Sequence, residues 1–291
     1  MGLKLLQILS ENNYEIYYIN RGKKYWNNQV KKIKNATHIF GNRNEKKEYT
    51  KLIKYVSEKA GITNSSNIKW SAVYDFCGYK YSEVQCTYEA LKGLIDIYVF
   101  ISTDSIYDAC DKKIRQSNLQ TQQILIKIYL NRNGNQFIKE QHAHKLKCEE
   151  FLYHYTQKDI FPFVILRLPD VIGPFDDTGR FWAYIKWIQK SQDYPIYIDD
   201  ECKNTKISFV FSEDVALLCL KLIDMNKRDI SYNSYNIAFK ENITLKQFFI
   251  KIVFFYNIDY IYLFLYLAIS FECQQFKFKR QRQCLQILSI S

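Results

Sequence analysis

The sequence lacks the short motifs that mark three large classes of enzyme. It contains no GxSxG, no GxxxxGK[ST] and no HExxH, which excludes the usual serine-hydrolase, P-loop and metallohydrolase sites. Its eight cysteines form no CxxC pair, and no cysteine or histidine cluster has the spacing of a zinc site. We therefore expect no metal centre. Most cysteines, such as Cys219 in the run ALLCLKLI, are expected to be small buried residues in a reducing, cytoplasmic compartment.

No signal peptide is visible at the N-terminus. The chain has 291 residues, of which 47% are hydrophobic and 24% charged, which is typical of a globular protein with a substantial core. The net charge is +11. Lys, Asn, Ile and Tyr are all abundant and share A/T-rich codons, so part of the basic excess is interpreted as genome composition. The alternative is a surface that binds polyanions such as nucleic acid.

Helical and strand patterns alternate along most of the chain. Helices are predicted at 2–11, 45–60, 83–94 and 144–156 from apolar spacing, and strands at 15–20, 38–41, 71–79, 95–103 and 163–173 from short apolar runs. Continuous apolar strands between helices predict a parallel sheet with helices on both faces. The carboxyl ends of its strands, and any ligand, then lie at one edge.

Two segments interrupt this alternation. Residues 111–141 are rich in Gln, Asn and Lys without clear periodicity, and they are interpreted as a surface insertion. Residues 254–291 combine a strongly apolar run with the basic KFKRQR. A membrane span needs about 20 apolar residues, and Asn257 and Asp259 interrupt the run. A buried helix or an aberrant tail is therefore favoured over a membrane anchor.

Four fragments, in order, resemble the extended short-chain dehydrogenase/reductase family, in its NAD-dependent epimerase/dehydratase branch. They are the helix from Gly2 with the strand ending Asn20-Arg21-Gly22; FISTDSIYDAC; HKLKCEEFL followed by FVILRLPDVIGP; and FVFSEDVALLCLKLI. The resemblance implies a Rossmann-like NAD(P)-binding domain at 1–168, with its first strand missing. A small substrate lobe is expected at 169–253, with 207–224 returning to the Rossmann sheet.

The resemblance also implies a cofactor site for NADP or NAD. A helix N-terminus at Gly2 would bind the pyrophosphate. Asn20 and Arg21 stand where an acidic residue normally binds the adenosine ribose, and a guanidinium suits a 2′-phosphate, which favours NADP. The remaining cofactor-binding candidates are Asn42, Cys77, Gly78, Lys145, Pro169 and Val171.

Catalysis in this family uses a Tyr as general acid–base, a Lys four residues later and a Ser or Thr at the preceding strand end. Thr103 and Lys145 match the last two, whereas Gln141 stands at the Tyr position. An amide cannot transfer a proton as a phenol does. His142 or His144 could act as a substitute acid, and Tyr107 is a second possible donor that is usually a structural neighbour.

The substrate candidates follow the last predicted strand. Asp170 lies in RLPDVIGP, and Arg180 opens the next helix, where it could pair with a phosphate or carboxylate. Asp214 in FVFSEDVA is expected to cap a helix rather than to act in catalysis.

Three hypotheses result. The first is an NAD(P)-dependent epimerase, dehydratase or reductase that acts on a nucleotide sugar, with a homodimer as a family expectation. The second is a non-catalytic relative that binds RNA, similar to the chloroplast stem-loop-binding branch. The third is an incomplete or mis-joined gene product, whose sheet would expose strand edges where its first strand is lacking.

Overall fold

The computed structural model describes residues 1–22, 29–109, 136–156, 160–176, 178–191, 200–241, 243–256 and 286–289. The chain divides into two compact units. The first comprises Met1–Pro169, Phe211–Ile237 and Ile287–Ser291, and the second comprises Asp170–Val210 and Ala238–Gln286. Each unit is described by itself.

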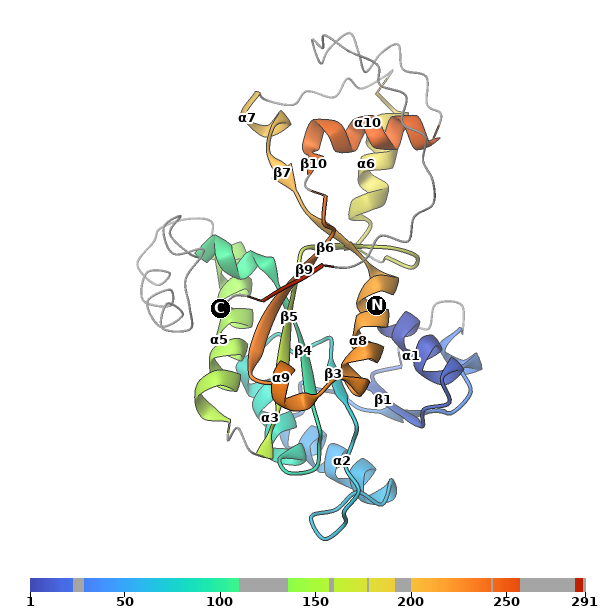
Figure 1. The fold of residues 1–291 in the computed structure, drawn as a ribbon, viewed down its shortest axis with the longest axis vertical. Coiled ribbons are helices and arrows are strands. Elements are labelled where there is room, and N and C mark those ends of the chain that lie inside the picture. Colours follow the sequence, from blue (N-terminus) through green and yellow to red (C-terminus); the bar gives the residue numbers. More distant parts are fainter. Residues whose placement is uncertain are drawn as a thin grey trace. The chain divides into compact units, whose positions relative to one another are not determined.

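The described strands of the first unit form two sheets, in which four pairs of neighbouring strands run parallel (Figure 1). In the smaller sheet, β1 (Ile16–Asn20) pairs with β2 (Ala36–Phe40), with Ile16 opposite Ala36. The larger sheet has the strand order β11-β9-β5-β4-β3. Its strands are β3 (Val73–Asp75), β4 (Tyr98–Thr103), β5 (Phe163–Leu168), β9 (Asn233–Ala238) and β11 (Gln286–Ser289).

Helices cover these sheets on both faces. They are α1 (Gly2–Glu11), α2 (Lys46–Lys59), α3 (Tyr81–Leu91), α5 (Gln136–Tyr155), α8 (Ser212–Asp224) and the short α9 (Lys227–Ile230). Helix α1 packs against α8, α2 against α3, and α3 against α5. Two 3-10 turns, η1 (Val30–Lys32) and η2 (Asp104–Ala109), complete the unit.

The core of the first unit forms around β4 and β5 because both strands are apolar along their whole length. Their segments YVFIST and FVILRL are buried almost throughout. This core contains the rings of Tyr98, Phe100, Phe161 and Phe163. Burial on both faces is the property expected of strands inside a helix-covered parallel sheet. The prediction of an α/β fold with parallel strands is therefore confirmed.

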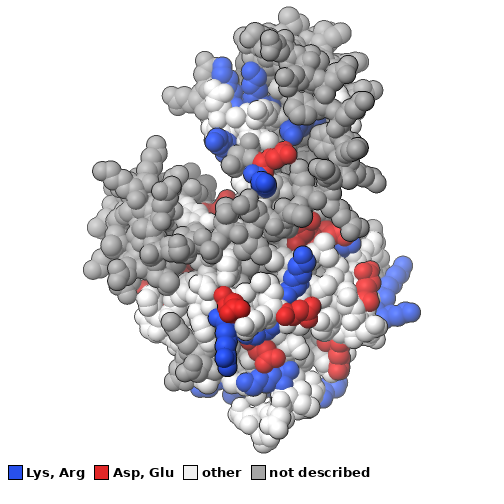
Figure 2. All heavy atoms as spheres, in the orientation of Figure 1, with Lys and Arg blue, Asp and Glu red and all other residues white. Residues whose placement is uncertain are grey.

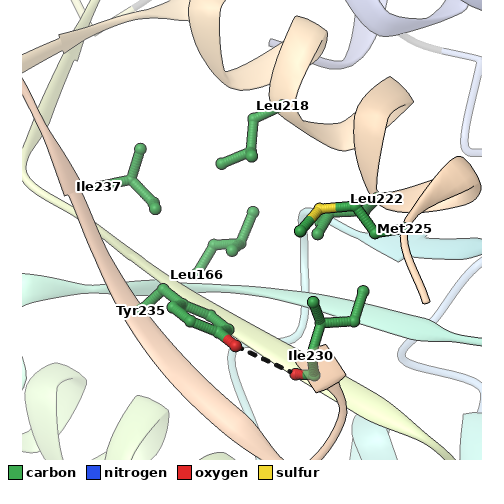
Figure 3. A pocket seen from close by; sticks show the side chains of 7 residues that line it. All are labelled: Leu166, Leu218, Leu222, Met225, Ile230, Tyr235 and Ile237. Carbon is green, nitrogen blue, oxygen red and sulfur yellow. Dashed lines mark hydrogen bonds between the residues drawn. The ribbon is translucent and has the colours of Figure 1, made fainter. Parts of the chain in front are cut away.

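A small apolar cavity lies on the α8 side of the larger sheet (Figure 3). Its volume is about 50 Å³. The side chains that line it come from β5, β9, α8 and α9 with the residues beside them, and they are Leu166, Leu218, Leu222, Met225, Ile230, Tyr235 and Ile237. The Tyr235 hydroxyl donates to the Ile230 carbonyl at 3.4 Å.

The second unit has its own core. Its strands are β6 (Asp170–Ile172), which pairs with β8 (Phe209–Phe211), and β7 (Lys206–Ile207), which runs antiparallel to β10 (Ile243–Thr244). Its helices are α6 (Arg180–Gln189), α7 (Asp200–Lys203) and α10 (Leu245–Tyr256). Phe248 and Phe249 of α10 pack with Ile185 and Ile188 of α6 in a cluster of aromatic and aliphatic side chains.

The two predicted interruptions of the fold, at 111–141 and 254–291, lie largely outside the described residues. The insertion was predicted at 111–141, but 136–141 belong to α5, because this polar first part of the helix carries no apolar stripe to reveal it. Residues 110–135 lie outside the described residues, as does most of the predicted 254–291 tail. Among the described helices, none has the length and hydropathy that a membrane span requires.

The capping prediction for Asp214 is wrong. The N-cap of α8 is Phe211, and no side chain caps the helix there. Because α8 begins at Ser212, Asp214 lies inside the first turn, where its charge interacts favourably with the helix dipole. Burial raises the pKa of its carboxyl.

Candidate functional site

Lys145 on α5 lies directly beside the end of β4. Its Nζ donates a hydrogen bond of 2.7 Å to the carbonyl oxygen of Ile101, two residues before Thr103. The sequence separation of 44 residues is bridged because α5 packs on β4 in the same unit. This contact places the Lys145 ammonium beside the strand that ends at Thr103.

The Lys145 ammonium is enclosed by apolar and aromatic groups. Its Nζ lies 4.6 Å from the ring centroid of Phe100 and 4.9 Å from that of Tyr79, which supports cation–π attraction. Burial lowers the pKa of Lys145, and the charge of Asp75 acts in the opposite direction. A lysine of this kind can donate hydrogen bonds in a nearly dry environment.

Gln141 lies four residues before Lys145 on the same helix, so the two backbone positions are about one turn apart on α5. The side chains of Gln141 and His142 lie outside the described residues, whereas His144 is partly buried. The acid–base roles considered for Gln141 and His142 therefore stay predictions.

Thr103 participates in the turn from β4 into η2. Its Oγ1 accepts a hydrogen bond of 3.2 Å from the Ser105 amide and lies 3.2 Å from the Ser105 hydroxyl. These contacts fix the Thr103 hydroxyl at the carboxyl end of β4, where parallel sheets present ligand-binding groups.

A buried ion pair between Glu149 and Arg167 lies behind this strand end. The Nη2 of Arg167 donates to Glu149 Oε2 at 2.6 Å, and Ser102 Oγ donates to Oε1 of the same carboxylate at 2.5 Å. Glu149 is one turn beyond Lys145, and Arg167 is on β5. The pair therefore fixes α5 against both central strands.

Tyr107 extends this network. Its hydroxyl accepts a hydrogen bond of 2.9 Å from Arg167 Nη1 and donates one of 2.8 Å to Asn236 Oδ1 on β9. Both sides of the phenol are thus engaged within the protein. These contacts support the structural role suggested for Tyr107 by the resemblance.

A second buried ion pair joins Arg43 to Asp75 at the end of β3. Asp75 accepts from Nη1 and Nη2 of Arg43, from the Tyr98 hydroxyl at 2.5 Å and from the Cys77 amide at 3.0 Å. Burial alone would raise the pKa of Asp75, but Arg43 and these donors outweigh it and lower the pKa. Neither residue was predicted from the sequence.

The turn at Cys77-Gly78 requires glycine for close packing. A Cβ on Gly78 would lie 2.7 Å from the Phe100 ring and 3.2 Å from Val84. Cys148 of α5 contacts this turn, because its Sγ lies 3.7 Å from the Gly78 carbonyl oxygen. Burial raises the pKa of the Cys148 thiol to about 12. Cys77 itself is exposed.

Other predicted cofactor residues lie at the ends of β1 and β2. Asn20 Oδ1 accepts from the Gly22 amide at 2.8 Å and lies 2.9 Å from His38 Nε2. Arg21 is exposed beside it. Asn42 donates to Glu45 at 2.8 Å, and this bond helps to form the turn into α2.

The remaining candidates are divided between the two units. Gly2 begins α1, and a Cβ there would have no atom within 4 Å. Pro169 is the last residue of the first segment of unit one, whereas Asp170, Val171 and Arg180 belong to unit two. The Arg180 side chain lies outside the described residues.

A family model for the NAD-dependent epimerase/dehydratase family matches residues 1–238. The chain belongs to this family. No curated protein gives a significant match.

Solved structures of low sequence identity share the fold of this epimerase/dehydratase chain. The Bordetella bronchiseptica enzyme WbmH in complex with NAD+ has a TM-score of 0.60 at 14% identity, over 90% of this chain and 79% of that one. WbmG from the same organism, with NAD and UDP, has a TM-score of 0.58 at 14% identity, over 88% and 74%. The UDP-N-acetylglucosamine 4-epimerase of Methanobrevibacter ruminantium, with UDP-N-acetylmuramic acid, has 0.60 at 15%, over 89% and 79%. These likenesses confirm the predicted Rossmann-like fold.

The described residues are compatible with a bound dinucleotide. The first turn of α1 at Gly2 carries backbone amides that suit a phosphate, and the exposed Asn20 and Arg21 lie at the end of β1. Lys145 offers an ammonium beside the end of β4.

Proposed function

We propose that this epimerase/dehydratase homologue binds NAD or NADP together with a nucleotide sugar and turns the sugar over slowly or not at all. The observation that carries this proposal is the placement of Lys145 beside the Thr103 end of β4 in a chain of this family. The solved neighbours crystallised with NAD, UDP or a UDP-sugar support the ligand classes.

The candidate site residues have the following proposed roles. Gly2 binds the pyrophosphate through its amide, Asn20 and Arg21 bind the adenosine ribose, and Lys145 binds the nicotinamide ribose. The cofactor, when bound, supplies the acceptor for a hydride. Thr103 orients the substrate oxygen. The amide of Gln141 cannot transfer a proton as a phenol does, and this is why we expect slow turnover.

The direct test is a titration of the purified chain with NADH and NADPH, with nicotinamide fluorescence as the readout. We expect saturable binding that weakens at least about tenfold in Lys145→Met, since a hydrogen bond to a charged group contributes about 1.5–3 kcal/mol. Lys147→Met is the matched control, because Lys147 is an exposed lysine on the same helix. No binding by the unaltered chain would refute the proposal.

Turnover is tested separately with Gln141→Tyr. This variant restores a phenol four residues before Lys145, and we expect it to convert UDP-glucose or UDP-N-acetylglucosamine faster than the unaltered chain. A positioned acid–base group contributes about 100- to 10,000-fold. Gln141→Phe controls for the ring without the hydroxyl. Equal rates for the Tyr and Phe variants would contradict the proposed cause of slow turnover.

The choice between NAD and NADP is proposed to depend on Arg21. We expect tighter binding of NADPH than NADH, and loss of that preference in Arg21→Ala, because the guanidinium would pair with the 2′-phosphate. The homodimer stays a prediction.

The RNA-binding alternative is not proposed. On the face shown in Figure 2, the described Lys and Arg side chains are interspersed with Asp and Glu, without one large basic area. Binding to phosphate backbones depends on gathered positive charge, and this face does not display it.

A further inference from the structure

The segment Asn20-Arg21-Gly22 forms a tight turn at the carboxyl end of β1. Asn20 Oδ1 accepts a hydrogen bond of 2.8 Å from the Gly22 amide two residues later, which is the pattern of an Asx turn. Gly22 has a φ of 64°, a left-handed conformation that glycine adopts without steric cost. Arg21 is the exposed residue between them, so the turn presents its side chain to solvent.

His38 of β2 supplies a second donor to the same oxygen. Its Nε2 lies 2.9 Å from Asn20 Oδ1. A backbone amide can only donate, so the Asn20 atom that faces Gly22 is the oxygen, and His38 must carry a hydrogen on Nε2 to bond it. Tyr18, the register partner of His38 on β1, stacks on the imidazole with ring centroids 4.9 Å apart and holds it in this orientation.

These two donors use the whole acceptor capacity of the Asn20 side chain. An amide oxygen has two lone pairs, and the amide nitrogen carries two hydrogens. With both lone pairs engaged, Nδ2 is the part of the exposed Asn20 side chain that can still bond a ligand. A guanidinium likewise has only donors. This strand end therefore offers a ligand donors from Asn20 and Arg21 and no acceptor from either side chain.

A strand end of this kind suits one form of the adenosine ribose. A free 2′-hydroxyl is normally bound by an acidic side chain, which accepts its hydrogen. A 2′-phosphate instead carries acceptor oxygens, which form charge-assisted bonds with a guanidinium. Asn20, with its oxygen held by His38, cannot take the place of the acidic residue, whereas its amino group and Arg21 can both donate to a phosphate.

We propose that His38 is a positioning residue for the choice of cofactor, which fixes the Asn20 amide so that the site selects a ribose 2′-phosphate over a 2′-hydroxyl. Without the His38 donor, one lone pair of Asn20 Oδ1 becomes available, and a 2′-hydroxyl gains an acceptor. This role rests on the proposed function, because the ligand is its dinucleotide. It differs from the role of Arg21, which supplies charge rather than orientation.

The test compares the binding of NADPH and NADH to variants of His38, with nicotinamide fluorescence as the readout. His38→Phe keeps a ring beside Tyr18 and removes the donor. We expect the ratio of the NADH to the NADPH dissociation constant to fall about three- to tenfold, the range expected for one hydrogen bond. His38→Gln, whose amide nitrogen can replace Nε2 as a donor, should restore the ratio. Thr37→Val is the matched control, because Thr37 is an exposed residue of β2 on the opposite face.

A double variant separates positioning from a merely structural role. Because His38 acts through Asn20, we expect His38→Phe to leave the ratio unchanged in an Asn20→Ala background. Asn20→Asp replaces the amino group with a second acceptor oxygen and keeps the bonds from Gly22 and His38. This variant should therefore reverse the preference and bind NADH more tightly than NADPH.

The outcomes for His38 and for the proposed function are distinguishable. A ratio that is unchanged in His38→Phe, or equal weakening of both dinucleotides in that variant, would overturn the role of His38 and leave dinucleotide binding intact. Tighter binding of NADH than of NADPH by the unaltered chain would also overturn it. Binding of neither dinucleotide by the unaltered chain would refute the proposed function, and the role of His38 with it.

Discussion

Two buried arginine–carboxylate pairs lie in the first unit. They differ in how many nitrogens of the guanidinium group donate hydrogen bonds. Arg167 donates through Nε, Nη1 and Nη2, and its partner Glu149 is fully buried. Arg43 donates hydrogen bonds only through Nη1 and Nη2, and its side chain is 17% exposed. Its Nε lies 3.9 Å from Glu83 Oε2 in an ion pair but has no hydrogen-bond partner among the described residues.

This difference follows from what each pair joins. Arg167 and Glu149 connect a helix and a strand that already pack in one sheet layer, so the geometry of every donor is fixed. Arg43 and Asp75 join two sheets that are not hydrogen bonded to each other. A charge pair at such a junction is held less tightly, and we expect it to contribute less to stability.

The largest expected effect is that of Arg167→Met. Removal of the guanidinium leaves the Glu149 carboxylate buried without its cation, and we expect the free energy of unfolding to fall by about 3–5 kcal/mol. Urea denaturation measures this loss. The double variant Arg167→Met/Glu149→Gln should recover part of it, and a loss below about 1 kcal/mol for the single variant would contradict the assignment.

Arg43→Met tests the other pair. We expect a smaller loss of about 2 kcal/mol, because water can reach the site and Asp75 keeps its bonds from Tyr98 and Cys77. Arg43→Lys, which keeps the charge without the paired donors, is the control. A loss equal to that of Arg167→Met would remove the distinction between the two pairs.

The stabilisation that the Asp75 carboxylate provides should depend on pH. Its folded pKa is lowered, so its contribution is fully present above the unfolded pKa of about 3.9 and is lost as the pH falls through the folded pKa. The difference in unfolding free energy between the unaltered chain and Asp75→Asn should therefore shrink on acidification. A difference that grows at low pH would mean that the sign of the shift is wrong.

Tyr107→Phe should give the smallest change of this series. The variant removes one hydroxyl, which accepts from Arg167 and donates to Asn236, and we expect a loss of about 1 kcal/mol in thermal or urea unfolding. Because Arg167 keeps its bonds to Glu149, the loss should not approach that of Arg167→Met. An unchanged stability would show that water replaces the hydroxyl.

The sequence was informative where the chain is apolar and uninformative where charges pair over long distances. The runs YVFIST and FVILRL predicted buried parallel strands, and the structure confirms them. Arg43 and Asp75 are 32 residues apart, so no local pattern connects them. Arg167 could have been noticed, since a charge inside an apolar strand requires a buried partner.

The candidate site was predictable in part for the same reason. Thr103 and Lys145 were found through fragments whose order resembles a family, and their proximity required only a parallel sheet with α5 packed on it. The start of α5 at Gln136 could not be predicted, because Phe137 and Ile138 are the only large apolar residues in its first two turns and form no repeating apolar stripe. The packing of Gly78 against Phe100 depends on tertiary contacts that no short pattern encodes.

The rate at which the buried thiols of the first unit are labelled can report how often its helices open. Burial raises the pKa values of Cys148 on α5 and Cys219 on α8 to about 12, whereas Cys202 of α7 is exposed. Only a thiolate reacts readily with alkylating reagents. At neutral pH, Cys148 should therefore be labelled only when α5 separates from the sheet, and Cys219 only when α8 does. The labelling rate of each thiol would then measure the opening of its own helix.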